Sequence, residues 1–330
     1  MRPHAFDAVG LGFSSIDLVG LTPELPGLDV GVQLEDITRQ GGGPVAQAMV
    51  TLARLGATVG FVGRMADDEP GQTMRQQLLH EGVDIAQVQI ARDARSPECL
   101  ILVHQPTGKR SICCFGGTIG SIRTREVDTD YLTAGRILHL DGIDIDAALW
   151  AAEIAHAAGV TVTLDAGGHN QRLLELVPLV DVLIAAEAFV STFVADGDIE
   201  SGVRELRAMG PRVVVVTCGD KGSYTAVEDD AFHTPQFVVD VVDTTGAGDV
   251  FHGAYVYGLL QDWDHRQIAE FASATAALKC TQLGGRAGIP NLETVMAFLN
   301  ERGRPVPTMR RRAANENPEV DLIREDSSTQ

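Results

Sequence analysis

The sequence predicts an α/β fold of three layers, in which helices cover both faces of a mostly parallel sheet. Short apolar segments alternate with longer helical ones through most of the 330-residue chain. Such alternation is typical of parallel sheets, because each crossover helix packs on a face of the sheet. Two β-rich segments, 14–40 and 97–118, break this rhythm, and we expect them to form a small β-sheet lid on one side.

The predicted elements follow from apolar runs bounded by turn residues and from longer segments that end in Gly. The first helix, 45–55, follows the run 41–44, which places Pro near its first position, and Gly56 comes after its end. A hairpin from 99–104 to 111–115 is expected in the lid, across a turn with Pro and Gly. The other predicted elements are strands at 8–11, 58–62, 137–140, 160–164, 182–184 and 213–217, and helices at 71–81 and 147–158.

One folded domain is expected over 1–305, including the lid. Beyond it the sequence loses its periodicity and is rich in Arg, Asn, Glu and Ser, which predicts a disordered tail over 306–330.

The composition excludes several classes of protein. Hydrophobic residues make up 45% and charged residues 22% of the chain, which is ordinary for a globular protein with a sizeable core. The formal charge of −19, from 26 basic and 45 acidic residues, argues against nucleic acid as a partner. No apolar run approaches the ~18 residues of a membrane span, and the N-terminus has no long apolar stretch. We therefore expect a cytoplasmic protein without a membrane partner.

The cysteines predict neither a zinc site nor a disulfide framework, because they are odd in number and contain no C-x-x-C pair. Buried free thiols in a reducing compartment are expected instead. The five are Cys99, Cys113, Cys114, Cys218 and Cys280.

The segment 241–254 carries the most informative motif. It is predicted to be a strand end, a turn of small residues and a helix that begins near Asp249. Gly246 and Gly248 leave backbone N–H groups uncovered at the positive end of this helix, so an anion can bind there. One interpretation is a packed turn with Asp249 as N-cap. The other is phosphoryl transfer, in which the amides of Ala247, Gly248 and Asp249 hold developing charge while Asp249 accepts a hydroxyl proton.

A P-loop kinase is excluded, because no G-x-x-x-x-G-K-[ST] sequence occurs. The chain instead resembles the ribokinase-like (phosphofructokinase-B) family of sugar and nucleoside kinases over almost all of 5–305. The resemblance is carried by the signature at 243–249 and by an N-terminal signature that starts at 41–48. It implies a ribokinase-like α/β/α sandwich with a lid, ATP and Mg²⁺ as cofactors, and a sugar as substrate.

The resemblance implies roles for the matching residues. Asp249 would be the catalytic base, with Gly246, Ala247 and Gly248 as the anion hole. Asp17 matches an acid that binds sugar hydroxyls, which suits a carboxylate because it accepts two hydrogen bonds. Without the family, a turn-capping Asp is the alternative for this residue. The other implied sugar-binding residues are Gly42, Gly43 and Gln47, the last at a position where the family usually has Asn.

The nucleotide and ion sites are implied in the same way. The segment 217–222 matches the family's T-x-G-x-x-G sequence, and the Gly284-Gly285 pair would lie close to the adenine. Asp243 and Thr245 are implied ligands of a monovalent cation, with potassium as the candidate ion. The implied nucleotide-binding residues are Thr217, Gly219, Gly222, Gly246, Gly248 and Gly285.

One departure concerns the family's N-x-x-E motif, which is tied to magnesium and phosphate binding. Its two positions are held here by Ala186 and Phe189, neither of which can ligate a metal. Mg²⁺ would then be held largely by ATP phosphates and water, with Glu187 as the candidate for an outer role. A plain surface acid is the alternative for Glu187.

The substrate stays open at the level of sequence. The hairpin with Lys109 and Arg110 and the segment 141–144 are expected to border the sugar pocket, although for Lys109 and Arg110 a role only as polar residues of a hairpin tip is the favoured alternative. Within the family the chain is most similar to kinases of a sulfonated sugar, yet Gly142 stands near where a sulfonate-binding Arg is expected. The alternatives are a nucleoside or deoxy-sugar-acid kinase and a catalytically silent sugar-binding regulator. The resemblance also implies a homodimer that pairs through the lid.

Overall fold

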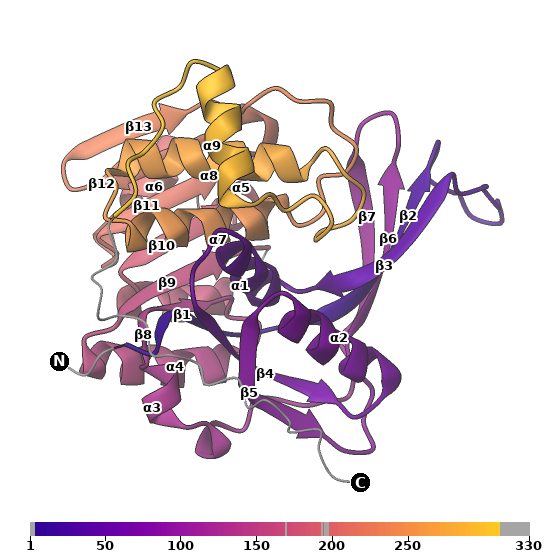
Figure 1. The fold of residues 1–330 in the computed structure, drawn as a ribbon, viewed down its shortest axis with the longest axis horizontal. Coiled ribbons are helices and arrows are strands. Elements are labelled where there is room, and N and C mark those ends of the chain that lie inside the picture. The colour runs from indigo at the N-terminus through magenta and orange to yellow at the C-terminus, as the bar shows by residue number, and fades with distance from the viewer. Residues whose placement is uncertain (1–3, 169, 193, 195–197, 311–330) are drawn as a thin grey trace, which may run out of the picture.

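The computed structural model describes residues 4–168, 170–192, 194 and 198–310, which form a body with a lid beside it (Figure 1). The body contains a nine-stranded sheet in the order β13-β12-β11-β10-β9-β8-β1-β4-β5. Pairing is parallel from β5 through β11, whereas β12 and β13 are antiparallel at one edge. The strands are β1 (Phe6–Leu11), β4 (Val59–Ala66), β5 (Val83–Ala91), β8 (Gly135–Leu140), β9 (Thr161–Ala166), β10 (Val182–Ala186), β11 (Val213–Thr217), β12 (Ser223–Val227) and β13 (Asp230–Thr234).

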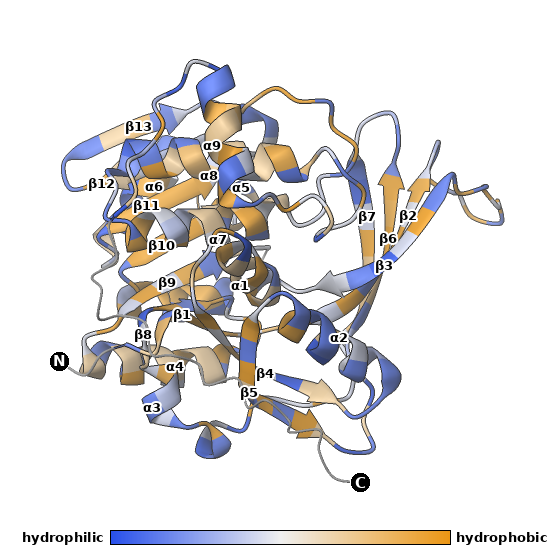
Figure 2. Cartoon of the chain, viewed as in Figure 1, coloured by the Kyte–Doolittle hydropathy of each residue, from blue (hydrophilic) through white to orange (hydrophobic). Residues whose placement is uncertain are grey.

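Helices cover both faces of this sheet, so the predicted three-layer fold is confirmed. One hydrophobic core lies beneath α1, α2, α7, α8 and α9, and a second beneath α4, α5 and α6. Val213 and Val215 face the first core while Val214 and Val216 face the second, which explains why β11 is an unbroken apolar run. Hydrophobic colour accordingly runs through the central strands (Figure 2). The helices are α1 (Pro44–Arg54), α2 (Glu69–His80), α3 (Thr129–Leu132), α4 (Ile145–Ala158), α5 (Glu187–Val190), α6 (Ile199–Ala208), α7 (Ala247–Leu260), α8 (His265–Lys279) and α9 (Leu292–Glu301).

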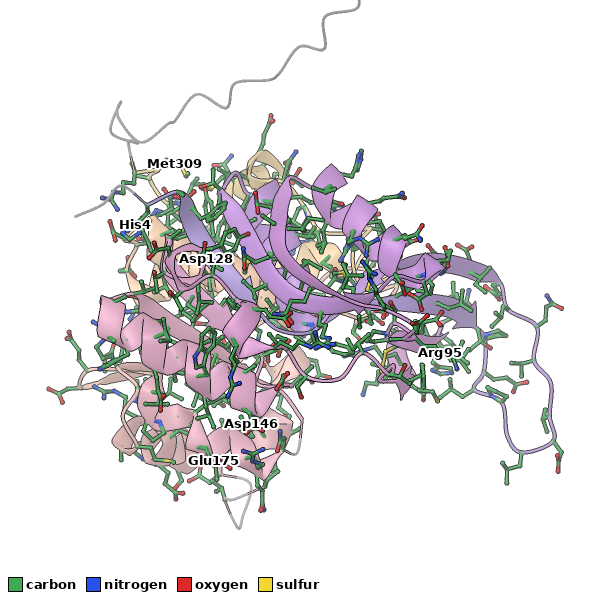
Figure 3. All side chains as sticks on the ribbon, turned by 90° about the horizontal axis from the view of Figure 1, so that it is seen from below. His4, Arg95, Asp128, Asp146, Glu175 and Met309 are labelled. Carbon is green, nitrogen blue, oxygen red and sulfur yellow. A yellow bond between two sulfur atoms is a disulfide. The ribbon has the colours of Figure 1, made fainter. Side chains whose placement is uncertain are left out.

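The lid is a four-stranded sheet in the order β3-β2-β6-β7, and it stands beside the body (Figure 1). Its strands come from the two segments predicted to form it, and β2 pairs with β6 in parallel. Arg95, between β5 and β6, lies where the lid joins the body (Figure 3). Its guanidinium is 4.4 Å from the centroid of the Phe115 ring. The strands are β2 (Ser15–Thr22), β3 (Asp36–Gly42), β6 (Glu98–His104) and β7 (Lys109–Phe115).

Two predictions of local structure are wrong. No strand precedes the 243–249 turn, because the backbone there bonds to the end of α8: Val242 N and Asp243 N donate to Cys280 O. The prediction of free thiols fails in the lid, where Cys99 and Cys114 lie directly opposite across β6 and β7 and form a disulfide. Cys113 is a free thiol but is exposed, whereas Cys218 and Cys280 are buried and free, as expected.

The predicted tail, 306–330, begins inside the described region. Its first residues pack on the body, since Trp263 Nε1 donates to Thr308 O at 2.8 Å and Arg310 pairs with Asp262 at 2.8 Å. The remaining 311–330 lie outside the described residues. Of the helices in the described part of the chain, none has the length and apolar character needed to cross a membrane.

Candidate active site

The residues expected to bind a sugar come together where the lid meets the large sheet. Gly42, at the end of β3, passes so close to Asp17 on β2 that any side chain at position 42 would overlap the Asp17 carboxylate. Gly43 has φ of 96°, and a side chain there would collide with the carbonyl of Phe13. Because Asp17 lies within a strand, the alternative of a turn-capping aspartate is wrong.

Asp17 is buried and prepared to accept hydrogen bonds. Its Oδ1 accepts one from Ser15 Oγ at 2.7 Å. Burial raises the pKa of Asp17, while the Ser15 hydrogen bond and the charge of Arg286 oppose that rise. These two groups favour the ionised form, in which a carboxylate can accept two hydrogen bonds from hydroxyl groups.

The anion-binding turn has the geometry that the sequence suggested. Gly246 adopts φ of 71°, and α7 begins at Ala247, two residues before the predicted start. No side chain caps this helix, so the interpretation of Asp249 as N-cap is wrong. The Ala247 N–H donates to Thr244 O at 3.2 Å, which leaves the N–H groups of Gly248 and Asp249 for an anion. Beside Gly248 the space is open, since a Cβ there would meet no atom within 4 Å.

Asp249 is the acid in this turn, and in the described structure no residue donates a hydrogen bond to its carboxylate. Burial raises its pKa to about 6, the charge of Arg110 opposes the rise, and the nearby Asp17 and Asp141 add to it. A carboxylate with a pKa near 6 is ionised at neutral pH and is still basic enough to take a proton.

Arg110 belongs to the site although sequence reasoning favoured a solvated hairpin tip. Its Nη1 donates to Thr244 Oγ1 at 3.1 Å, and Thr244 N and Oγ1 both donate to Gly108 O at 3.0 Å. The tip of the lid hairpin is therefore joined to the anion-binding turn. The signal available in the sequence was a cationic pair directly after the glycine of a hairpin turn.

Asp165 was missed, and Asp141 was expected only as part of the segment 141–144 that borders the sugar pocket. Asp141 follows β8 and accepts hydrogen bonds from Phe13 N at 2.7 Å and Ile143 N at 3.0 Å, and burial raises its pKa to about 6. Asp165 ends β9, with its Oδ1 3.5 Å from His252 Nε2. Burial and the neighbouring Asp249 and Asp141 raise its pKa. Both could have been found from sequence, because the carboxyl ends of adjacent parallel strands form ligand sites.

Asp243 connects the anion-binding turn to α8 and to the loop that follows it. Its carboxylate accepts from Thr245 N and Gly284 N, each at 2.7 Å, and its carbonyl accepts from the Lys279 ammonium at 2.8 Å. Thr245 Oγ1 is buried without a hydrogen-bond partner among the described residues. An unpartnered hydroxyl oxygen beside a carboxylate fits a cation ligand, although the Asp243 oxygens already accept two N–H groups.

The amide of Gln47 contacts the loop that follows α8 and the anion-binding turn. Gln47 Oε1 accepts from Arg286 Nε at 2.9 Å, and its Nε2 faces Gly246 and Gly285. The extra methylene relative to Asn takes the amide to the loop that follows α8. Sequence reasoning saw the longer reach but could not identify the partner.

The expected nucleotide segment forms the turn after β11. Gly219 and Gly222 have φ of 57° and 86°, and a Cβ on Gly219 would meet no atom within 4 Å. Thr217 pairs with Ala186 of β10 in the sheet register, so the segment 217–222 lies beside the position of the missing N-x-x-E motif.

The residues at that motif have structural partners instead. Phe189 is fully buried in the second core, and Glu187 Oε1 lies 2.9 Å from Lys221 Nζ. Gly142, where an anion-binding Arg was considered, has φ of 62°, and a side chain there would collide with Leu173. Phe189 therefore cannot contribute to a magnesium site, and position 142 cannot hold an anion-binding Arg.

Comparisons with known proteins agree with this geometry. The model of the pfkB family carbohydrate kinases matches residues 7–292. The chain is 29% identical to the ATP-dependent ribose-1-phosphate kinase of Halopiger xanaduensis, over 88% of this chain and 97% of that protein. It is 27% identical to the 5-dehydro-2-deoxygluconokinase of Shouchella clausii, over 90% and 96%.

A solved structure of Arabidopsis thaliana ribokinase complexed with ribose and ATP superimposes with a TM-score of 0.76 at 25% identity, covering 91% of this chain and 99% of that one. The family match spans both sheets and every residue of the site from Asp17 to Gly285. The chain therefore belongs to the pfkB family of carbohydrate kinases, with the ribokinase-like fold.

Proposed function

We propose that this kinase transfers the γ-phosphoryl group of ATP to a hydroxyl of an uncharged sugar, with Asp249 as the general base. The observation that carries the proposal is the position of Asp249: a half-buried carboxylate in the first turn of α7 that accepts no hydrogen bond from the described residues. A substrate hydroxyl is the partner that such a group lacks. Intact Asp249 and its turn also argue against a silent sugar-binding regulator.

The sugar is bound before transfer by Asp17 and by the backbone of Gly42 and Gly43. The acceptor hydroxyl points to Asp249, which takes its proton as the oxygen attacks in line. The first-turn amides of α7 and the Arg110 guanidinium stabilise the negative charge that develops on the transferring group. The lid excludes water, which prevents loss of ATP by hydrolysis.

The nucleotide would lie along the segment 217–222, with its phosphates directed to the start of α7 and Gly285 near the base. Mg²⁺ bound to the phosphates supplies charge neutralisation there. Ala186 and Phe189 offer it no ligand, and Glu187 is paired with Lys221, so an outer contact from Glu187 would require that ion pair to open. Thr245 and Asp243 are the candidate ligands for potassium.

An uncharged acceptor is favoured by the acids that gather at the site. Asp17, Asp141, Asp165 and Asp249 are all buried or half-buried there, and a phosphate or carboxylate on the substrate would be repelled by them. This argues for a hydroxyl-rich sugar over the sugar phosphate or sugar acid that the two relatives' names specify.

The proposal is tested by a panel of ketoses, aldoses, nucleosides, sugar phosphates and sugar acids, with sugar-dependent ADP release as the readout. We expect turnover of at least one neutral sugar, loss of that turnover in Asp249→Ala, and higher rates with K⁺ than with Na⁺. Turnover that survives in Asp249→Ala would contradict the mechanism. No turnover across the panel would favour the regulator.

A homodimer through the lid is part of the proposal. Ile37, Leu18 and Leu100 lie on the same face of three neighbouring lid strands, and each is exposed over more than a third of its surface. An apolar lid face of this kind is suited to pairing with a second copy. Light scattering on Leu100→Lys, with a dimer expected only for the unmodified chain, tests it.

A further inference from the structure

Arg286, in the loop after α8, is a buried cation whose role the proposed mechanism leaves open. It is only 5% exposed, and its guanidinium lies flat against the backbone of Gly41 at the end of β3, where any side chain would overlap it. No carboxylate of the described residues lies within ion-pairing distance of it. Burial lowers its pKa to about 10, so it stays charged at neutral pH.

The partners of Arg286 are three glutamine side chains from three different elements. Its Nε donates to Gln47 Oε1 of α1 at 2.9 Å, and its Nη1 donates to Gln77 Oε1 of α2 at 3.2 Å. Gln40 Oε1 of β3 accepts from the backbone N–H of Arg286 at 2.7 Å and of Ala287 at 3.0 Å. Gln77 Oε1 also accepts from Gly41 N at 2.7 Å.

This network links the two halves of the active site. On the sugar side, Gln40 and Gly41 directly precede the substrate glycine Gly42 on β3. On the phosphate side, the Gln47 amide nitrogen lies against Gly246 and Gly285. Because Arg286 fixes the Gln47 carbonyl oxygen, it also fixes which end of that amide faces the anion-binding turn.

Burying a charged guanidinium against neutral amides is costly, and a hydrophobic filling would stabilise the loop more. A role in fixing the positions of its glutamine partners best explains why a buried guanidinium is present here. Arg286 also acts on the pKa of Asp17. Burial and the charge of Asp243 raise this pKa, whereas the Ser15 hydrogen bond and the positive charge of Arg286 lower it. Arg286 thus acts on both the position and the charge of sugar-binding groups.

We propose that Arg286 is a positioning residue for phosphoryl transfer, which through Gln47 and Gln40 holds the sugar-binding strand end in register with the anion-binding turn. This inference rests on the proposed kinase function. The guanidinium fork is required, because a lysine ammonium cannot donate to Gln47 and Gln77 in one plane.

The test compares Arg286→Ala, Arg286→Lys and Arg54→Ala by steady-state kinetics and thermal unfolding. Arg54 is the matched control: it borders the same cavity and donates hydrogen bonds to the carbonyls of Arg286 and Ile289, but among the described residues no hydrogen bond joins it to Gln47. Arg286→Ala and Arg286→Lys are expected to lower kcat roughly tenfold to hundredfold, the cost of a small misalignment. Arg54→Ala is expected to lower the unfolding temperature while kcat stays within about twofold, as for a site outside the reacting groups.

Two further readouts separate positioning from mere scaffolding. A cavity of about 610 Å³ lined by Gln40, Gln77 and Arg286 gives small ions access to this place, so guanidinium, but not urea or Na⁺, should restore part of the kcat of Arg286→Ala. The acid limb of kcat/KM for the sugar should move to higher pH in Arg286→Ala but not in Arg286→Lys, which keeps the charge near Asp17.

Equal loss of kcat in Arg54→Ala, or absence of both rescue and pH shift, would overturn the inference and leave Arg286 a structural residue. An inactive wild-type protein would instead refute the proposed function. In that case binding of sugar measured by calorimetry would still test the network, since Arg286→Ala should weaken it and Arg54→Ala should not.

Discussion

Arg110 on the lid donates a hydrogen bond to the hydroxyl of Thr244 at 3.1 Å. Thr244 directly precedes the buried Thr245 and lies five residues before Asp249. A residue of the lid thus contacts the turn that is proposed to hold the transferring phosphoryl group. Because Arg110 opposes the rise in the Asp249 pKa, lid position and base strength are coupled through one side chain.

Removal of Arg110 should therefore change rate and pH dependence together. In Arg110→Ala we expect kcat to fall roughly a hundredfold, as for the loss of one charge-stabilising donor. The acid limb of its kcat profile should also shift to higher pH. The neighbouring Lys109, which is exposed, provides the control, and Lys109→Ala should match the wild type in both measurements. Unchanged kinetics in Arg110→Ala would show that the contact with Thr244 serves only the lid.

The raised pKa of Asp249 predicts a pH profile for the wild type. The base must be ionised, so kcat should fall as pH drops through about 6. Asp249→Asn should lose about 10²- to 10⁴-fold of kcat at pH 7.5. A profile flat down to pH 5 would contradict the assignment.

The same pKa makes a prediction about stability. A carboxyl whose folded pKa is raised binds more protons in the folded state than in the unfolded state, so it destabilises the fold as pH rises from about 4 to 6. Asp249→Asn removes this effect and should unfold at a higher temperature than the wild type at pH 7.5. The difference should shrink as pH falls toward 4, where the folded carboxyl is protonated and the unfolded one, with a pKa of 3.8, begins to be protonated as well.

Two glycines of the anion-binding turn should respond differently to alanine. Gly246→Ala places a side chain at positive φ, which costs about 1–2 kcal/mol of stability. Gly248→Ala meets open space at the start of a helix, so the free energy of unfolding should be unchanged or rise by up to about 1 kcal/mol. Its methyl group would nevertheless occupy the space that a phosphate needs. Thermal unfolding and kcat measured together should show a stable, inactive Gly248→Ala, and full activity would show that phosphate does not approach there.

The lost magnesium motif should not be restorable by substitution. Phe189 is fully buried, so Phe189→Glu removes core packing and buries a charge, and it should cost at least about 3 kcal/mol by denaturant unfolding. The matched change Phe189→Leu should cost much less. A Phe189→Glu variant of normal stability would mean that this position reaches solvent.

The fold was predictable because its signals are local and repeated. The unbroken valines of β11 and the Gly-Pro start of α1 each specify an element without knowledge of the rest of the chain. The failures concern contacts between distant segments. Cys99 and Cys114 become partners only through the register of β6 and β7, and the backbone before Asp243 is tied to the end of α8.

The residues of the candidate site show the same difference between local signals and contacts of distant segments. Asp17, Gly42 and Asp249 could be found from motifs, whereas Arg286 could not be assigned because its partners lie 239 and 209 residues away in sequence. Asp165 carries no motif of its own and is recognised by its place at the end of β9, beside Asp249.

Strand β3 of the lid ends at Gly42 and is followed directly by Gly43 and helix α1, so the lid and the backbone proposed to contact the sugar are one continuous segment. Any displacement of the lid must then displace the groups that are proposed to bind the sugar. Measured sugar affinity will include the free energy of moving the lid, and by thermodynamic reciprocity a bound sugar will favour the closed lid by the same amount. Weak binding of a candidate sugar to the free protein would thus report the conformational equilibrium as much as the fit of the pocket.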